Sequence, residues 1–316
     1  MRRDHWAAKT YTRRGFTVAE QYPEIEVIVA KSAGTCFGVE AAINIAEKIR
    51  KPILGPLVHN PKIVGDLASQ GIPILERYAD LDDVEGLEEV VITAHGYPKE
   101  LKAALRERGI TFHDATCPVL LKWVYRKIET FEREGYHVIL IGNPDHAEII
   151  ASRSYGTDIS VVYDEDAVDL LRDGIKKTVA ICQTTITKEK FDRVVACIRE
   201  RKYPNLRAVD TRCKPVKNQQ EAVAGLAQWV DAMLIVGGYD SSNTTNLARI
   251  AKEHLPARTY HIDSDALIQR DWLVGVRHLG IGAGTSTPKE QIEAVQDRIA
   301  AVYPGAVVFR TGDGSR

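Results

Sequence analysis

The sequence predicts an α/β fold built from three similar units with largely parallel sheets. Along the chain, short apolar runs typical of strands alternate with amphipathic stretches typical of helices. One pattern also occurs three times, within residues 26–49, 110–131 and 206–229: an apolar run, a polar turn, a cysteine and an amphipathic helix. With 316 residues, the chain is long enough for two or three domains of ~100–200 residues each.

In each copy, the helix is predicted from apolar residues that recur at helical spacing. A cysteine at a helix N-terminus faces unpaired backbone N–H groups and the positive end of the helix dipole, which favour the thiolate over the thiol. Three such cysteines far apart in sequence can meet only where three units converge, so they suit a metal centre better than a disulfide. The apolar sets are Val39, Ala42, Ile43 and Ala46 after Cys36; Leu121, Val124, Ile128 and Phe131 after Cys117; and Val223, Leu226, Ala227 and Val230 after Cys213.

Each unit carries two further loops that follow predicted strands and contain polar residues. In open α/β sheets, sites form beyond the carboxyl ends of strands, so we expect these loops to line one pocket with the cysteines at its floor. The residues are His59, Asn60 and His95 in the first unit, His146, Glu148, Thr184 and Thr185 in the second, and Ser241, Ser242, Asn243 and Ser286 in the third.

The hydroxyl, amide and imidazole groups of these loops make a donor-rich lining in which Glu148 is the only acidic residue. Several of the residues open predicted helices, so backbone N–H groups would point the same way. The loops therefore predict an anion site, with phosphate or diphosphate as its natural guest. The alternative is that the Ser, Thr and Asn residues are only helix N-caps and the histidines are structural. We expect His113, beside the strand before Cys117, to be structural.

Two kinds of metal centre are compatible with the three cysteines. The first is zinc with three Cys and one His, in which His59, His95 or His146 would supply the fourth ligand, although the close cysteine pairs of zinc fingers are missing. The second is an iron–sulfur cluster held by three thiolates, which leaves one iron open. These residues alone leave both alternatives open. Cys182 lies in an apolar run and Cys197 in a helical pattern, so both are expected to be buried packing residues.

Composition excludes several other classes of protein. A net charge of −1 provides no basic field for nucleic acid. No apolar stretch approaches the ~18 residues of a membrane span, and residues 1–24 lack the apolar core of a secretory signal. Five cysteines without close spacing argue against a disulfide framework. We therefore expect a cytoplasmic protein with a polar extension at residues 1–24.

Eight motifs, in order along the chain, resemble those of the 4-hydroxy-3-methylbut-2-enyl diphosphate reductase family, iron–sulfur enzymes of the non-mevalonate isoprenoid pathway. They are GTCFGVEAAI, GPLVHNP, TAHG, DATCP, HAE, QTT, SSNTTNL and AGTSTP, and the similarity runs from about residue 25 to about residue 304. The resemblance implies three similar α/β domains around a central cavity that contains a 4Fe–4S cluster. The expected domains are residues 38–117, 118–212 and 213–316, with the N-terminal strand within 25–37 joining the third domain.

The resemblance also implies the activity and the role of each site residue. The expected reaction is reductive dehydroxylation of 4-hydroxy-3-methylbut-2-enyl diphosphate to isopentenyl and dimethylallyl diphosphate. It would use an open-iron 4Fe–4S cluster and external electrons from a carrier such as ferredoxin or flavodoxin. Glu148 would deliver protons, and Thr184 would hold the substrate near its hydroxyl. The implied cluster ligands are Cys36, Cys117 and Cys213, and the implied diphosphate ligands are His59, His95, His146, Ser241, Ser242, Asn243 and Ser286.

The sequence departs from the family pattern close to these residues. Thr35 replaces the usual aromatic residue before the first cysteine, and the VEAAI stretch of the following helix lacks the usual basic residue. Ala147 replaces a proline, and Pro215, Val216 and Lys217 replace small and hydroxyl residues. Neighbouring hydrogen bonds tune a cluster, so these changes bear on redox potential and substrate preference. The alternatives are a paralogue acting on a related allylic diphosphate, a non-catalytic cluster-bearing redox or diphosphate-binding protein, and a zinc hydrolase of diphosphates.

Overall fold

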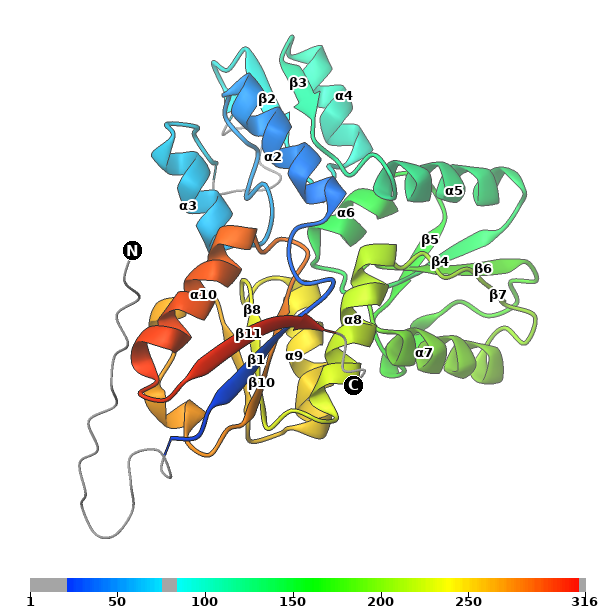
Figure 1. Ribbon diagram of the computed structural model, residues 1–316. Helices are drawn as coiled ribbons and strands as arrows, with labels where there is room; N and C mark the ends of the chain where they lie inside the picture. Colours follow the sequence, from blue (N-terminus) through cyan, green and yellow to red (C-terminus); the bar gives the residue numbers. More distant parts are fainter. Residues whose placement is uncertain (1–21, 76–83, 313–316) are drawn as a thin grey trace.

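Three separate parallel sheets organise the computed structural model of the protein, which describes residues 22–75 and 84–312 (Figure 1). Every strand pair within these sheets is parallel. The predicted α/β fold with largely parallel sheets is therefore confirmed. The predicted extension at residues 1–24 lies, apart from its last three residues, outside the described part of the chain, and the domain boundaries stay a prediction.

The five-stranded sheet, in the order β11-β1-β10-β8-β9, joins the N-terminal strand to the C-terminal third of the chain. Its three central strands, β1, β10 and β8, are almost entirely apolar because helices cover both faces. Helix α10 packs on the face that carries Val27 and Leu234, and helices α8 and α9 pack on the face that carries Ile28 and Ile235. The elements are β1 (Ile25–Ala30), α8 (Lys214–Ala227), β8 (Ala232–Val236), α9 (Ser242–His254), β9 (Thr259–Ile262), η3 (Asp265–Leu267), η4 (Arg270–Leu273), β10 (His278–Ala283), α10 (Lys289–Val302) and β11 (Val307–Gly312).

The four-stranded sheet, in the order β5-β4-β6-β7, forms the second unit. Its two central strands are fully buried, because α5 and α6 pack on one face and α7 packs on the other. The elements are α5 (Leu121–Arg133), β4 (His137–Ile141), α6 (Ala147–Arg153), β5 (Ile159–Val162), η2 (Asp166–Leu170), β6 (Thr178–Cys182), α7 (Lys188–Arg201) and β7 (Arg207–Ala208).

The first unit has the smallest sheet, the pair β2-β3. Single bridges from Ile53 to Ile74 and to Val91 extend it. Helices α2 and α3 bury Ala42, Ala46 and Leu67 against it. The elements are α2 (Phe37–Ile49), α3 (Pro61–Ser69), β2 (Glu89–Ile92), α4 (Lys99–Glu107) and β3 (Thr111–Asp114).

Each of the three repeated cysteines lies where the chain passes from one sheet to the next. Cys36 follows β1 and precedes α2, which packs in the first unit. Cys117 follows β3 and precedes α5, which packs on the four-stranded sheet. Cys213 follows β7 and precedes α8, which packs on the five-stranded sheet. Because each crossover leaves the carboxyl end of a strand, the three crossovers bring the cysteines to a common centre.

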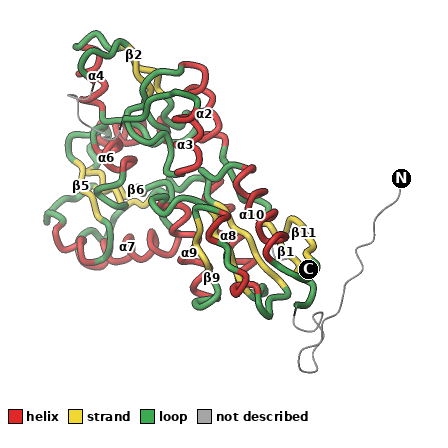
Figure 2. The backbone as a smooth tube through the Cα atoms, turned by 90° about the vertical axis from the view of Figure 1, so that its left-hand side faces the viewer, coloured by secondary structure: helices red, strands yellow, loops and turns green. Residues whose placement is uncertain are grey.

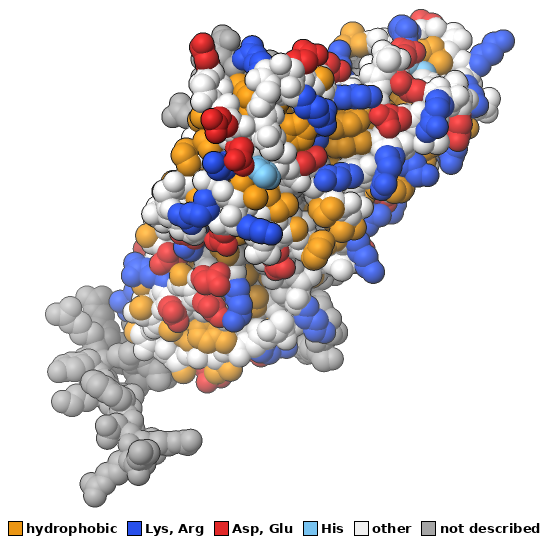
Figure 3. Space-filling view, turned by 90° about the horizontal axis from the view of Figure 1, so that it is seen from above, with side chains coloured by type: hydrophobic (Ala, Val, Ile, Leu, Met, Phe, Trp, Pro, Cys, Tyr) orange, Lys and Arg blue, Asp and Glu red, His pale blue; other side chains and the backbone are white. Residues whose placement is uncertain are grey.

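The elements fall into three groups in the side view, with α2, α3 and α4 at the top, β5, β6 and α7 at the lower left, and β1, β9, β11, α8, α9 and α10 at the lower right (Figure 2). Positive and negative side chains are interspersed on the face seen from above (Figure 3), in agreement with the net charge of −1. Among the described helices, none combines the length and the apolar character needed to cross a membrane.

Candidate functional site

A cavity of about 100 Å³ lies where the three units meet, and every predicted site residue except Asn60 lines it. The structure thus brings together residues that are up to 250 positions apart, from Cys36 to Ser286. No lysine or arginine is among the described residues that form its wall. An anion in this cavity would therefore be held by neutral donors and backbone N–H groups rather than by cationic side chains. The predicted residues that line the cavity are Cys36, His59, His95, Cys117, His146, Glu148, Thr184, Thr185, Cys213, Ser241, Ser242, Asn243 and Ser286. The expectation for Asn60 was wrong, because its side chain caps the N-terminus of α3 and donates to Oε1 of Gln291 instead.

The thiols of the three repeated cysteines all line this cavity. Cys36 and Cys213 are the N-caps of α2 and α8, as predicted. Cys117 instead lies one turn before α5, because residues 118–120 form a turn first. A Cβ atom added to Gly38 would lie 2.8 Å from the Sγ atom of Cys117 and 3.8 Å from that of Cys36. The two sulfurs therefore approach each other across a position that only glycine leaves open.

The ionisation of these thiols differs from the sequence-based expectation. Burial raises the pKa of Cys36, and it raises the pKa of Cys213 to about 12. The neighbouring Cys117 thiol acts in the same direction in both cases, whereas backbone N–H groups at the helix starts oppose the shift. The expectation that the helix N-termini would favour the thiolates was wrong for these two residues, because the loss of solvent outweighs the backbone donors.

The three histidines of the pocket form one cluster. The ring centroids of His59 and His95 are 4.2 Å apart, and the ring of His146 lies 5.6 Å and 5.8 Å from them. Burial lowers the pKa of all three, to about 4 for His146 and well below the usual value for His95. All three rings are therefore neutral near pH 7. The buried Nε2 of His59 and Nδ1 of His95 have no hydrogen-bond partner among the described residues.

The hydrogen bond of His146 to its own helix shows which of its ring nitrogens carries the proton. Its Nδ1 atom accepts the backbone N–H of Glu148 at 3.2 Å, as the N-cap of α6. In a neutral ring whose Nδ1 is an acceptor, the proton is on Nε2. His146 therefore keeps an Nε2–H group as a donor for a guest.

Glu148 is buried, with 4% of its surface exposed, and Thr184 holds both of its carboxylate oxygens. The backbone N–H of Thr184 donates to Oε1 at 2.6 Å, and the Thr184 hydroxyl donates to Oε2 at 2.7 Å. Burial raises the pKa of Glu148 to about 7, although the two bonds from Thr184 act in the opposite direction. The group is therefore poised to hold or release a proton near neutral pH.

The hydroxyl groups of the pocket belong to a network that sequence reasoning did not identify. The side chain of Gln183 accepts the backbone N–H of Asn143 and donates to the hydroxyls of Thr185 and Ser242 at 3.0 Å and 3.1 Å. Thr185 and Ser242 also share a hydrogen bond of 3.0 Å. One of their two hydroxyl hydrogens joins the pair, so the other stays available to a guest. Ser241 is the N-cap of α9, which agrees with the alternative that these polar residues are helix caps. Ser241 also lines the cavity.

Two buried glutamines on α8 were also missed, although the spacing of apolar residues in the sequence indicates that their helix face is buried. Val216, Gln219, Gln220 and Val223 recur at the spacing of one helix face, and all four are buried. Polar residues on a buried face need hydrogen-bond partners, which makes them candidates for a role in the site. Gln219 contacts Asn243 of the cavity wall.

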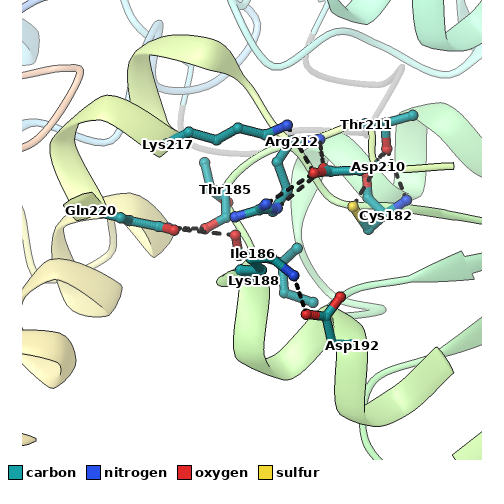
Figure 4. A network of polar contacts seen from close by, with 10 residues as sticks. All are labelled: Cys182, Thr185, Ile186, Lys188, Asp192, Asp210, Thr211, Arg212, Lys217 and Gln220. Carbon is teal, nitrogen blue, oxygen red and sulfur yellow. Dashed lines mark hydrogen bonds and ion pairs between the residues drawn. The ribbon is translucent and has the colours of Figure 1, made fainter. Parts of the chain in front are cut away.

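The residues expected to be structural behave as predicted. Cys182 and Cys197 are buried, each within the core of the second unit. Nε2 of His113 pairs with Oε2 of Glu89 at 3.0 Å. The hydroxyl of Thr211 accepts the backbone N–H of Cys182 and donates to its carbonyl oxygen (Figure 4).

The segment before Cys213 is held by two further contacts. Asp210 bonds Arg212 and Lys217, which flank the cysteine, and these partners hold the pKa of Asp210 at about 2 against the effect of its burial (Figure 4). The backbone N–H of Cys213 donates to the carbonyl oxygen of Thr184 at 2.9 Å. Within residues 22–75 and 84–312, no group of three or more His, Cys, Asp or Glu side chains is arranged to hold a single metal ion.

The chain is similar to proteins of one family over most of its length. The family described as LytB protein matches residues 27–300. The 4-hydroxy-3-methylbut-2-enyl diphosphate reductase of Aquifex aeolicus is 36% identical, over 90% of this chain and 99% of that one. The enzyme of the same name from Alkaliphilus oremlandii is also 36% identical, over 87% and 99%.

Two solved structures share the fold. A structure of (E)-4-hydroxy-3-methyl-but-2-enyl diphosphate reductase, described as the terminal enzyme of the non-mevalonate pathway, has a TM-score of 0.62 and 36% identity, and covers 88% of this chain and 99% of its own. The E-1-hydroxy-2-methyl-but-2-enyl-4-diphosphate reductase of Plasmodium falciparum has a TM-score of 0.83 at 20% identity, and covers 93% and 94%.

Proposed function

Because the chain belongs to the LytB protein family, we propose that it is an oxidoreductase that converts 4-hydroxy-3-methylbut-2-enyl diphosphate to isopentenyl and dimethylallyl diphosphate. The observation that carries this proposal is the composition of the central cavity. Three thiols, a buried acid and a set of neutral donors line one space. A reductive dehydroxylation needs these three parts: a redox centre, a proton source and a handle for the diphosphate.

The residues present fit an iron–sulfur cluster held by Cys36, Cys117 and Cys213. Thiolates are the ligands that such clusters take, and three of them leave one iron open. The glycine at position 38 supports this assignment, since a Cβ atom there would press on the sulfur of Cys117. When bound, a 4Fe–4S cluster would supply single electrons and a Lewis-acidic iron. The electrons would come from a separate carrier such as a ferredoxin or flavodoxin.

Glu148 and Thr184 provide a path for the proton. When Glu148 is protonated, Oε1 keeps the backbone N–H of Thr184, and the acid proton on Oε2 points to the Thr184 hydroxyl. That hydroxyl can then turn its own hydrogen toward a guest. A proton moves from Glu148 through Thr184 to the departing oxygen, which leaves as water. Two electrons and two protons are consumed for each C–O bond broken, and the second proton goes to the allylic carbon.

The remaining donors of the cavity suit the diphosphate. His146 offers Nε2–H, and the pair of Thr185 and Ser242 offers one hydroxyl hydrogen. The unpartnered ring nitrogens of His59 and His95 are buried at the same place. An anion would raise the pKa values of these imidazoles, so protonation on binding would strengthen the contact.

A second candidate substrate is a related allylic diphosphate with a different hydrocarbon part. Val216 supports it, because it lines the cavity at a point where the family resemblance predicts small or hydroxyl residues. Val39, Val58 and Leu121 add to an apolar portion of the wall. This portion would contact the hydrocarbon of the substrate.

The test is a turnover assay on anaerobically purified protein with a chemical reductant and analysis of the products by mass. We expect the two five-carbon diphosphates to appear from the hydroxylated diphosphate. We expect the free alcohol to be a very poor substrate, because it loses several charge-assisted hydrogen bonds at ~1.5–3 kcal/mol each. Conversion of a longer allylic diphosphate alone would favour the second candidate. Equal kcat/KM for alcohol and diphosphate would contradict the proposed binding mode.

A further inference from the structure

The amide of Asn243 is oriented within the protein in a way that affects what it can offer to a guest. This side chain lines the cavity and is buried, with 2% of its surface exposed. Its Nδ2 atom donates to Oε1 of Gln219 at 2.7 Å and to the hydroxyl of Thr285 at 3.5 Å. Its oxygen, Oδ1, has no hydrogen-bond partner among the described residues. Both N–H groups are thus used inside the protein, and the acceptor is left over.

Gln219 fixes this orientation because its own amide cannot be reversed. Its Nε2 atom donates to the carbonyl oxygens of Ser32 and Gly34, at 2.9 Å and 3.0 Å. Carbonyl oxygens only accept hydrogen bonds, so the nitrogen of Gln219 must face them and its oxygen must face Asn243. That oxygen in turn requires the nitrogen of Asn243. The two backbone carbonyls of the loop before Cys36 therefore determine which end of the Asn243 amide remains for the cavity.

We propose that Gln219 is a positioning residue that makes Asn243 present its oxygen to the guest, so that the site selects a phosphate group that carries a hydrogen. This inference rests on the proposed function, because it concerns the same anion site. A buried acceptor that faces a fully ionised oxygen stays unpaired and is costly, whereas a protonated phosphate oxygen donates to it. The site therefore discriminates between anions of equal charge by whether they carry a hydrogen that can be donated.

The neighbouring Gln220 provides a matched control on the same helix. It is also buried, with 7% of its surface exposed against 3% for Gln219. Its Nε2 atom also donates to two backbone carbonyls, those of Thr185 and Ile186, at 3.3 Å and 3.4 Å (Figure 4). Of these two glutamines, Gln219 alone bonds the amide of Asn243. Replacing either glutamine by methionine removes a similar pair of backbone contacts, but only one replacement frees Asn243.

The experiment measures direct binding of two inorganic dianions, hydrogenphosphate and sulfate, to the anaerobically purified full-length protein at mildly alkaline pH. The two ions have the same charge and shape, and only hydrogenphosphate has a hydrogen to donate. We expect the wild-type protein and Gln220→Met to prefer hydrogenphosphate by about tenfold or more, as for a ligand that pairs a buried acceptor. In Gln219→Met, the Asn243 amide is free to turn and the preference falls to near unity.

Gln219→Glu separates orientation from structural support. The carboxylate cannot donate to the carbonyls of Ser32 and Gly34, but it still accepts from the nitrogen of Asn243. Its charge acts equally on both dianions. We therefore expect weaker binding of both ions with the wild-type preference retained.

The outcomes that overturn the inference are distinct. Equal affinity of the wild-type protein for the two ions would overturn it without any variant, and so would a preference that survives in Gln219→Met or disappears equally in Gln220→Met. Failure of both ions to bind would remove the anion site itself and the proposed diphosphate mode with it. Because binding is measured without turnover, a result that contradicts this inference can be distinguished from one that contradicts the proposed reaction.

Discussion

Thr184 binds both carboxylate oxygens of Glu148, through its backbone N–H at 2.6 Å and its hydroxyl at 2.7 Å. The contact fixes the carboxyl group at the wall of the cavity, where burial raises its pKa to about 7. A carboxylic acid with this pKa is about half protonated at neutral pH, which suits a group that gives a proton to a leaving oxygen.

Replacing Glu148 by Gln should abolish most turnover and keep the metal centre. The amide has the same shape and can still bond Thr184, but it cannot release a proton. We expect kcat to fall by ~10²–10⁴-fold, measured with a strong reductant in excess. Asp145→Asn is the control, because Asp145 precedes the same helix but is exposed, and it should be far milder. Near-normal kcat in Glu148→Gln would remove this residue from the mechanism.

The pH dependence of kcat should report the same group. The active form is the protonated acid, so kcat should fall as the pH rises through about 7. The Thr184 hydroxyl lowers the pKa of Glu148 by bonding its charged form, so Thr184→Val should move the inflection to higher pH while lowering kcat. A pH–rate profile of the two proteins checks this. An inflection that stays in place or moves to lower pH in Thr184→Val would contradict the assignment.

Gly38→Ala should lower the iron content of the protein without unfolding it. The new Cβ atom would lie 2.8 Å from the Sγ atom of Cys117, so the sulfur must shift. Gly65→Ala is the control, because Gly65 is also helical and an added Cβ there meets nothing within 4 Å. Alanine is favoured over glycine in helices by about 1 kcal/mol, so the thermal unfolding temperature of the control should not fall. Full iron content in Gly38→Ala would show that this space is not needed.

Much of the fold and the site could be predicted from periodicity and residue type. Strand–turn–helix patterns place the residues after each strand at the carboxyl edge of its sheet, so the positions of His95, Glu148 and Ser241 at such edges follow from the pattern. The sequence does not reveal that the chain passes to a different sheet at each cysteine, because that depends on which sheet the following helix covers. The raised pKa of Cys213 was also missed, since burial cannot be read from a turn.

The orientation of polar side chains was beyond sequence reasoning for a similar reason. Asn243 was predicted as an amide donor to an anion, but its N–H groups are used by Gln219 and Thr285. The partner that decides this lies 24 residues away, and its own amide is fixed by a loop some 185 residues away. Only the folded chain shows such relationships.

The five cysteines should separate into two groups. Cys36→Ser, Cys117→Ser and Cys213→Ser should each lose iron, sulfide and activity, because each removes a proposed ligand from the cavity. Cys182→Ala and Cys197→Ala should keep all three, with at most a loss of stability from the buried core. Anaerobic iron and sulfide analysis of the five variants checks this. A wild-type iron content in Cys213→Ser would show that this thiol is not a ligand.

The central claim is that the three thiols at the meeting point of the sheets hold an iron–sulfur cluster. It is tested most directly by measuring iron, acid-labile sulfide and zinc in the anaerobically purified wild-type protein. We expect about four iron and about four sulfide per chain, as in a 4Fe–4S cluster, and no stoichiometric zinc. Stoichiometric zinc without sulfide would contradict it and would favour a zinc hydrolase of diphosphates instead.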